Sequence, residues 1–120
     1  MSEKPLATVG SVVIDTEDVD RLVEFWGTLL GLEEKHRSGS YFVWLTSMGK
    51  GGPSLAFQKV PERKSGKNRL HLDLGVEDKD AAVARISELG GSKIDEHTNQ
   101  GFTWYVMADP EGNEFCIGAV

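Results

Sequence analysis

The sequence predicts an α+β fold built from two tandem βαβββ modules, and two observations carry this prediction. The first is an internal repeat: shifted by 60 positions against itself without a gap, the chain matches itself at nine positions between Ser11 and Gln58, where about three matches are expected by chance. The second is that strand-like and helix-like hydrophobic patterns follow one another in the same order in both halves. Two copies of this length indicate a duplicated module rather than a solenoid. The matching pairs are Glu17/Glu77, Asp18/Asp78, Asp20/Asp80, Val23/Val83, Leu29/Leu89, Gly31/Gly91, Phe42/Phe102, Trp44/Trp104 and Gly52/Gly112.

Each half opens with a strand and continues with a helix. The segment RLHLDLGV (69–76) alternates apolar and polar residues, which is typical of a strand with two different faces, and VGSVVI (9–14) takes the same place in the first half. Asp18 and Asp78 stand where a carboxylate can cap a helix. Apolar residues at helical spacing follow in both halves: Val19, Leu22, Val23, Trp26, Leu29 and Leu30, and Ala82, Val83, Ile86 and Leu89.

Three further strands are expected to complete each half. The turn 109–113, with the sequence DPEGN, places proline and glycine where a tight turn needs them, so it should join the last two strands as a hairpin. A polar connector over 59–68 separates modules of 9–58 and 69–118, which together form one domain over 1–120. The expected strands are 33–37, 41–47 and 54–59, then 92–96, 102–107 and 114–118.

A sheet covered by a helix on one side leaves its other face open, and strand alternation predicts which residues line that face. We expect the open faces of the two modules to form a shared trough, where small molecules bind. Trp44 and Trp104 either line this trough or lie beneath the helices. The residues expected on the open faces are Ser11, Val13, Ala56, Gln58, His71, Asp73, Glu114 and Cys116.

Composition narrows the class of protein. The 120 residues are 39% hydrophobic and 27% charged, as in ordinary globular domains. The net charge of −6 disfavours a nucleic-acid partner. The single cysteine, Cys116, excludes an intrachain disulfide and fits a reducing compartment. No signal peptide or membrane-spanning stretch is evident, so we expect a cytoplasmic protein without a membrane partner.

The duplicated module and its closing segment DPEGNEFCI (109–117) resemble the vicinal oxygen chelate superfamily, which includes glyoxalase I, the bleomycin-resistance proteins and the extradiol dioxygenases. Further similarity lies in the segments 14–33 and 69–91, and the small bacterial glyoxalase-like proteins are most similar. The resemblance implies a fold with a shared trough. It also implies that metal ligands, where present, occupy Ser11, Ala56, His71 and Cys116. Only His71 is a usual ligand of the family at its position.

These positions predict no tightly bound catalytic metal. Ala56 offers no donor atom and Ser11 is a poor one, whereas an open catalytic site needs about three protein ligands. A register slip of two residues would give His71, Gln58 and Glu114 instead, so a divalent metal is an alternative. His36 and His97 are expected in polar surface segments, and Cys116 is expected to be a small, buried hydrophobic residue.

We therefore expect a small-molecule-binding protein with an aromatic trough. The alternative is an enzyme of lyase, isomerase or dioxygenase type that uses His71 as a base or metal ligand. A purely structural role for His71 is also open. Exposed sheet edges favour a homodimer. His71 and Glu114 are the candidate catalytic residues, and the candidate ligand-binding residues are Ser11, Gln58, Asp73, Trp44, Trp104 and Cys116.

Overall fold

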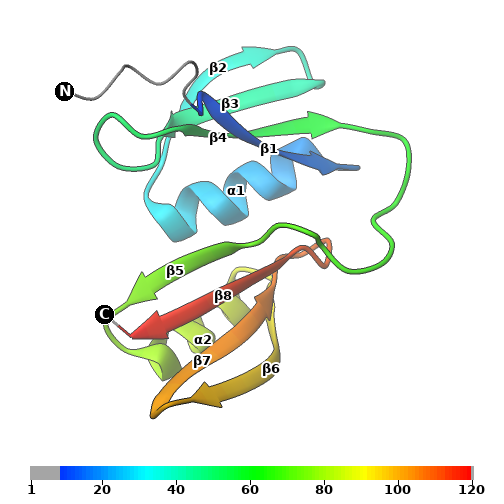
Figure 1. Cartoon of the computed structure of the whole chain (residues 1–120). Helices are drawn as coiled ribbons and strands as arrows, with labels where there is room; N and C mark the ends of the chain where they lie inside the picture. Colours follow the sequence, from blue (N-terminus) through cyan, green and yellow to red (C-terminus); the bar gives the residue numbers. More distant parts are fainter. Residues whose placement is uncertain (1–8, 120) are drawn as a thin grey trace, which may run out of the picture. The chain divides into compact units, whose positions relative to one another are not determined.

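The computed structural model describes residues 9–119, which divide into two compact units between Pro61 and Glu62. Each unit is one βαβββ module, as the sequence predicts (Figure 1). No helix in the described part of the chain is long and apolar enough to cross a membrane. The first unit contains β1 (Ser11–Thr16), α1 (Val19–Leu30), β2 (Glu34–Ser38), β3 (Phe42–Ser47) and β4 (Ser54–Lys59); the second contains β5 (Leu72–Val76), α2 (Lys79–Glu88), β6 (Ser92–Asn99), β7 (Phe102–Ala108) and β8 (Glu114–Ala119).

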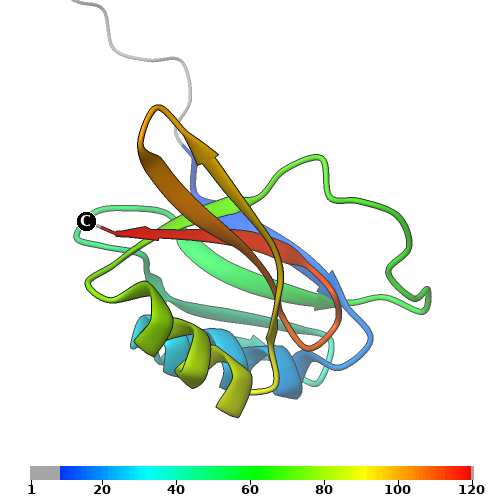
Figure 2. The ribbon, with the colours of Figure 1, turned by 90° about the horizontal axis from the view of Figure 1, so that it is seen from below.

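The two sheets have the same topology. Their strand orders are β1-β4-β3-β2 and β5-β8-β7-β6, with the first and last strands of each module parallel and the other pairs antiparallel. Each helix packs on one face of its own sheet: α1 contacts β3 and β4, and α2 contacts β6 and β8. Figure 2 shows α2 on one side of the sheet that contains β8. Within residues 9–119, the opposite face of each sheet carries no helix of its own module.

Burial of apolar side chains between each helix and its sheet holds each module together. Fully burying one such side chain stabilises the fold by about 1.5–3 kcal/mol. The helix starts follow the expectation: Asp18 accepts a hydrogen bond from the Arg21 backbone N–H, and Asp78 accepts from those of Asp80 and Ala81. Buried side chains include Leu22, Phe25, Trp26, Val43, Leu45, Leu55 and Phe57 in the first unit and Ile86, Met107, Phe115 and Ile117 in the second.

The last hairpin of the second module is closed by a tight turn, as expected. The Asp109 N–H donates to the Asn113 carbonyl over 2.9 Å. The Asp109 side chain accepts from the backbone N–H groups of Glu111 and Asn113, both at 2.9 Å. The corresponding turn of the first module is closed by a 2.8 Å bond from the Met48 N–H to the Pro53 carbonyl, and it encloses one residue more.

Strand pairing breaks the sequence repeat in one place. The parallel pairs β1–β4 and β5–β8 follow the repeat, since Val12 lies opposite Leu55 and its counterpart Leu72 lies opposite Phe115, the counterpart of Leu55. The tryptophans do not: Trp44 lies opposite Ala56, but Trp104 lies opposite Gly118, two residues beyond the counterpart of Ala56.

The longer turn and a bulge in β3 between Trp44 and Ser47 together account for these two residues. A shift of two keeps a side chain on the same face of its sheet, whereas a shift of one would reverse it. Because Val43 and Leu45 are fully buried and Trp104 lines an open pocket, both tryptophans lie on the face away from the helices.

Candidate functional site

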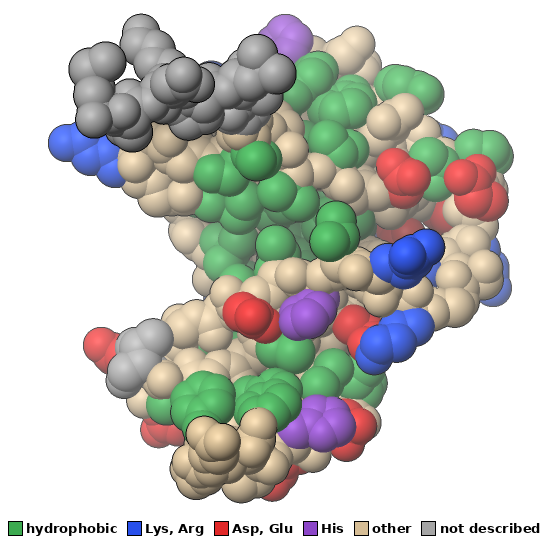
Figure 3. Space-filling view, in the orientation of Figure 1, with side chains coloured by type: hydrophobic (Ala, Val, Ile, Leu, Met, Phe, Trp, Pro, Cys, Tyr) green, Lys and Arg blue, Asp and Glu red, His purple; other side chains and the backbone are tan. Residues whose placement is uncertain are grey.

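A pocket of about 680 Å³ lies on the open face of the second sheet, and every residue that lines it belongs to the second unit. This volume is within the range of small-molecule sites, about 300–1,000 Å³. In Figure 3, hydrophobic and histidine side chains gather on the strand-bearing face of this unit, drawn in the lower half of the view. The pocket has a polar end, formed where β5 meets β8, and an aromatic end, formed by β6, β7 and the end of β8.

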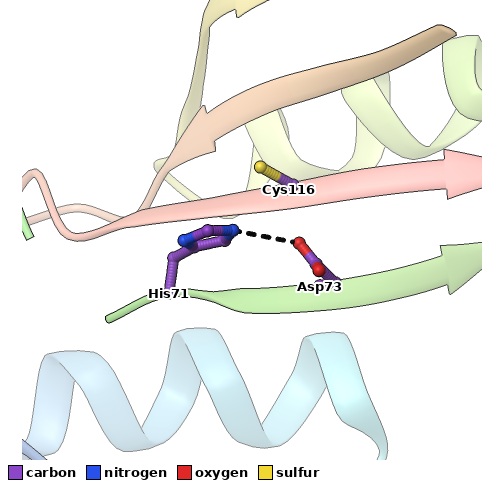
Figure 4. A group of neighbouring side chains, drawn as sticks. All are labelled: His71, Asp73 and Cys116. Atoms are coloured by element: carbon purple, nitrogen blue, oxygen red, sulfur yellow. Dashed lines mark ion pairs between the residues drawn. The ribbon is translucent and has the colours of Figure 1, made fainter. Parts of the chain in front are cut away.

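His71, Asp73 and Cys116 form the polar end (Figure 4). His71 directly precedes β5, and Asp73 follows two residues later, so strand alternation turns both side chains to the same face. Cys116 lies opposite Asp73 on β8. The His71 Nε2 atom is 3.2 Å from Asp73 Oδ1. One nitrogen, one oxygen and one sulfur of the three residues all lie within 4.8 Å of one another.

The surroundings of Cys116 raise the pKa of its thiol and so disfavour the thiolate form. Its partial burial raises the pKa, and the negative charges of Asp73 and Glu114 raise it further. The thiolate is the nucleophilic form of cysteine, so Cys116 in this state is a weak nucleophile. From the sequence we expect Cys116 to be buried, whereas its side chain is half-buried and lines the pocket.

Glu114 lies at the edge of the polar end and contacts two residues of the connector between the modules, Lys67 and Asn68. Its Oε1 atom is 3.3 Å from Lys67 Nζ, and its backbone carbonyl accepts a 3.3 Å hydrogen bond from the Asn68 side chain. The Glu114 side chain is 23% exposed, whereas that of Lys67 is 81% exposed. These contacts connect residues 67–68 to the start of β8 and occupy part of the Glu114 carboxylate.

The aromatic end consists of His97, Trp104 and Phe102. The Trp104 ring stacks on Phe102 with centroids 6.0 Å apart and lies 5.6 Å from the His97 ring. Gly118 makes room for this arrangement, because a Cβ atom there would stand 2.9 Å from the Phe102 ring. Half of the Phe102 surface, 51%, is exposed. The aromatic end is therefore an open platform beside the polar end.

Two of these residues were missed by the sequence analysis. His97 was expected in a polar surface segment, but β6 runs to Asn99 and pairs His97 with Trp104. All eight residues of β6 are exposed, so no apolar alternation marked it as part of a lining strand. Phe102 could have been found, since it shares the strand parity of Trp104.

The structure thus brings five of the predicted site residues into one pocket: His71, Asp73, Trp104, Glu114 and Cys116. The other predicted site residues lie in the first unit. Ser11 is exposed at the start of β1, Gln58 donates a 3.2 Å hydrogen bond to the Tyr41 hydroxyl, and Trp44 packs against Phe42 and His36. Their part in ligand binding, and the alternative metal set of His71, Gln58 and Glu114, stay predictions.

The residues of the polar end fit a divalent metal ion. Imidazole nitrogen, carboxylate oxygen and cysteine sulfur are the donors that zinc uses, and three protein ligands is the number found in open catalytic sites. The sequence analysis counted only His71 and Cys116 as able ligands at the family positions. Asp73 supplies the third donor because it faces Cys116 across the strand pair.

Comparison with known proteins agrees with this fold. A family profile described as a glyoxalase-like domain matches residues 11–118. No curated protein matches the sequence significantly. The structure is similar to that of a glyoxalase/bleomycin resistance protein/dioxygenase family enzyme from Burkholderia phytofirmans, with 23% identity, a TM-score of 0.73, and coverage of 95% of this chain and 99% of that one.

Two other solved structures extend the comparison. Lactoylglutathione lyase from Agrobacterium tumefaciens is 20% identical with a TM-score of 0.67, covering 97% of this chain and 96% of that one. A mutant of the fosfomycin resistance protein FosX from Listeria monocytogenes, complexed with Mn(II) and a dihydroxypropylphosphonic acid, is 14% identical with a TM-score of 0.77, covering 96% and 90%. At these identities the similarity shows the fold alone.

Proposed function

Because this chain belongs to the glyoxalase-like domain family, we propose that it binds a small organic molecule in the pocket of its second module. One observation carries the proposal: an exposed aromatic platform and a group of polar side chains line the same pocket of about 680 Å³. Pockets that combine apolar walls with a few convergent polar groups are the usual sites for small molecules.

The distance between the polar end and the aromatic end of the pocket indicates what kind of ligand fits. Trp104 lies opposite Gly118, and Asp73 lies opposite Cys116, two residues earlier on β8. Two residues along a strand span about 6–7 Å. The pocket therefore suits a molecule with a flat ring, which stacks on Trp104 and Phe102, and a polar group about that distance away. An aromatic contact of this kind contributes about 0.5–1.5 kcal/mol beyond its buried area.

This mode of binding needs no tightly held metal. His71 and Asp73 are 52% and 80% exposed, so both can form hydrogen bonds with a ligand directly. Asp73 accepts hydrogen bonds, and His71 either donates or accepts according to its protonation state.

A second candidate function is catalysis, and the contact between His71 and Asp73 favours it. Asp73 lies against Nε2 of His71, which leaves Nδ1 free to exchange a proton with a bound molecule. An imidazole held by a carboxylate is a common general base. A divalent metal held by His71, Asp73 and Cys116 would supply Lewis-acid polarisation of a substrate oxygen. His71 would then hold the metal rather than carry the proton.

A fragment screen by two-dimensional ¹H–¹⁵N NMR tests the binding proposal. The chain has three tryptophans, so their indole N–H signals can be assigned with the variants Trp104→Phe and Trp44→Phe. Flat fragments that carry a polar group should shift the Trp104 signal and leave that of Trp26, which is 1% exposed, unchanged. Trp104→Ala should abolish their binding. Fragments that bind without shifting the Trp104 signal, and equally well to Trp104→Ala, would place the ligand site elsewhere.

A further inference from the structure

The donor atoms at the polar end converge from two neighbouring strands. One donor atom from each of His71, Asp73 and Cys116 lies within 4.8 Å of the others. The side chains of His71 and Asp73 are 52% and 80% exposed, so much of their surface faces solvent rather than packed neighbours. Ligands of one metal ion lie about 2.0–2.3 Å from it, so the three donors need only a modest inward movement to share an ion.

The types of donor select the ion. Thiolate and imidazole favour zinc-class ions, whereas manganese, magnesium and calcium prefer sites made of oxygen ligands. We propose that His71, Asp73 and Cys116 bind Zn²⁺ or Co²⁺ in a site built from the second module alone, with Asp73 as the ligand that completes it. When the ion binds, a metal–sulfur bond forms and the thiol proton of Cys116 passes to the solvent. Three protein donors leave at least one coordination position for a ligand that is not part of the chain.

The exposure of two of the three ligands sets the expected strength of this site. Water competes for an exposed site, and three protein donors hold an ion less firmly than the four of a structural zinc site. We therefore expect a reversibly bound ion that is lost during purification with chelator. This differs from a tightly bound catalytic metal.

The chain contains its own control for this site. Asp95 and His97 on β6 form a second pair of the same kind, with His97 Nε2 3.3 Å from Asp95 Oδ2 and side chains that are 62% and 50% exposed. Cys116, the single cysteine of the sequence, groups with His71 and Asp73 rather than with that pair. If a histidine–aspartate pair were enough to bind the metal ion, both pairs should bind it equally. The proposed site predicts that the ion binds only at His71 and Asp73, beside Cys116.

Cobalt titration of the chelator-treated full-length protein tests the proposal. A bond between cobalt and thiolate gives a near-ultraviolet charge-transfer absorption, and with one cysteine in the chain this absorption reports on Cys116 alone. We expect it to appear with one equivalent of Co²⁺, to disappear on addition of Zn²⁺, and to persist in excess Mn²⁺. The variants are Cys116→Ser, Asp73→Asn and Asp95→Asn, with folding checked by circular dichroism.

The variants separate the outcomes. Cys116→Ser should lose the absorption. Asp73→Asn should raise the half-saturating Co²⁺ concentration about tenfold or more, because loss of even a residue that only supports a metal ligand commonly costs about 10–100-fold in affinity, and Asp95→Asn should leave it unchanged. Absence of the absorption in the unaltered protein would overturn the proposal. An Asp73→Asn variant that titrates like the unaltered protein would also overturn it, and it would do so without affecting the ligand-binding proposal, which the Trp104 signal reports separately.

Discussion

The two modules carry the same aromatic cluster, a histidine, a tryptophan and a phenylalanine, but use it differently. In the first module the Trp44 ring lies 4.1 Å from that of Phe42 and 5.1 Å from that of His36. In the second module the corresponding distances from Trp104 are 6.0 Å and 5.6 Å. The first cluster is closely packed, and the second is spread open as the wall of a pocket.

Register produces this difference. Trp44 lies opposite Ala56, which is fully buried, whereas Cys116, the counterpart of Ala56, lies opposite Val106 and lines the pocket. A turn that is one residue shorter and a strand without a bulge move Trp104 by two residues along β8. The duplicated sequence thus gives two copies of one fold, and the second copy carries the group of donors formed by His71, Asp73 and Cys116. A shift of two residues gives each side chain new neighbours on the paired strand but leaves it on the same face of the sheet.

Truncation of the two tryptophans should separate the two clusters most strongly. Trp44→Ala removes a half-buried ring that packs closely against Phe42 and His36, so it should lower the free energy of unfolding by about 2–3 kcal/mol, at or below the range for fully buried aromatic side chains. Trp104→Ala should cost about half as much, because its ring has more distant partners and an open side. Urea denaturation of both variants measures the difference. Equal losses would mean that the second cluster is as tightly packed as the first.

Filling the space beneath Phe102 should have a smaller effect on stability and a specific effect on binding. Gly118→Ala places a methyl group 2.9 Å from the Phe102 ring, and this half-exposed ring can swing away, so the cost should stay below about 1 kcal/mol. Affinity for fragments found in the Trp104 screen should fall about three- to tenfold as the stacking partner moves. Phe102→Leu should reproduce that loss. If Phe102→Leu binds as well as the unaltered protein, Trp104 alone forms the platform.

The sequence predicts the fold well because the local signals agree with one another. Helix-capping aspartates, the turn at 109–113 and the alternation of 69–76 all specify the same module, and strand parity places His71, Asp73 and Cys116 on one face. It does not predict how the aromatic strands pair. An ungapped repeat aligns Trp44 with Trp104, and neither a bulge nor a turn that gains one residue leaves a mark in that alignment. His97 escapes notice for a related reason, since a fully exposed edge strand has no hydrophobic period.

The central claim is that the second module is open where the first is closed, and thiol accessibility tests it most directly. N-ethylmaleimide should label the native Cys116 in the folded protein. The variant Ala56→Cys, made in a Cys116→Ser background, should resist labelling until the protein is unfolded, because Ala56 is fully buried. Burial raises the pKa of the Cys116 thiol most, and the charge of Asp73 raises it further. Labelling of Cys116 in the folded protein should therefore be slower at neutral pH than labelling of the unfolded chain, and it should accelerate as the pH rises. It should also be faster in the variant Asp73→Asn. Equal labelling rates at positions 56 and 116 in the folded protein would contradict the account.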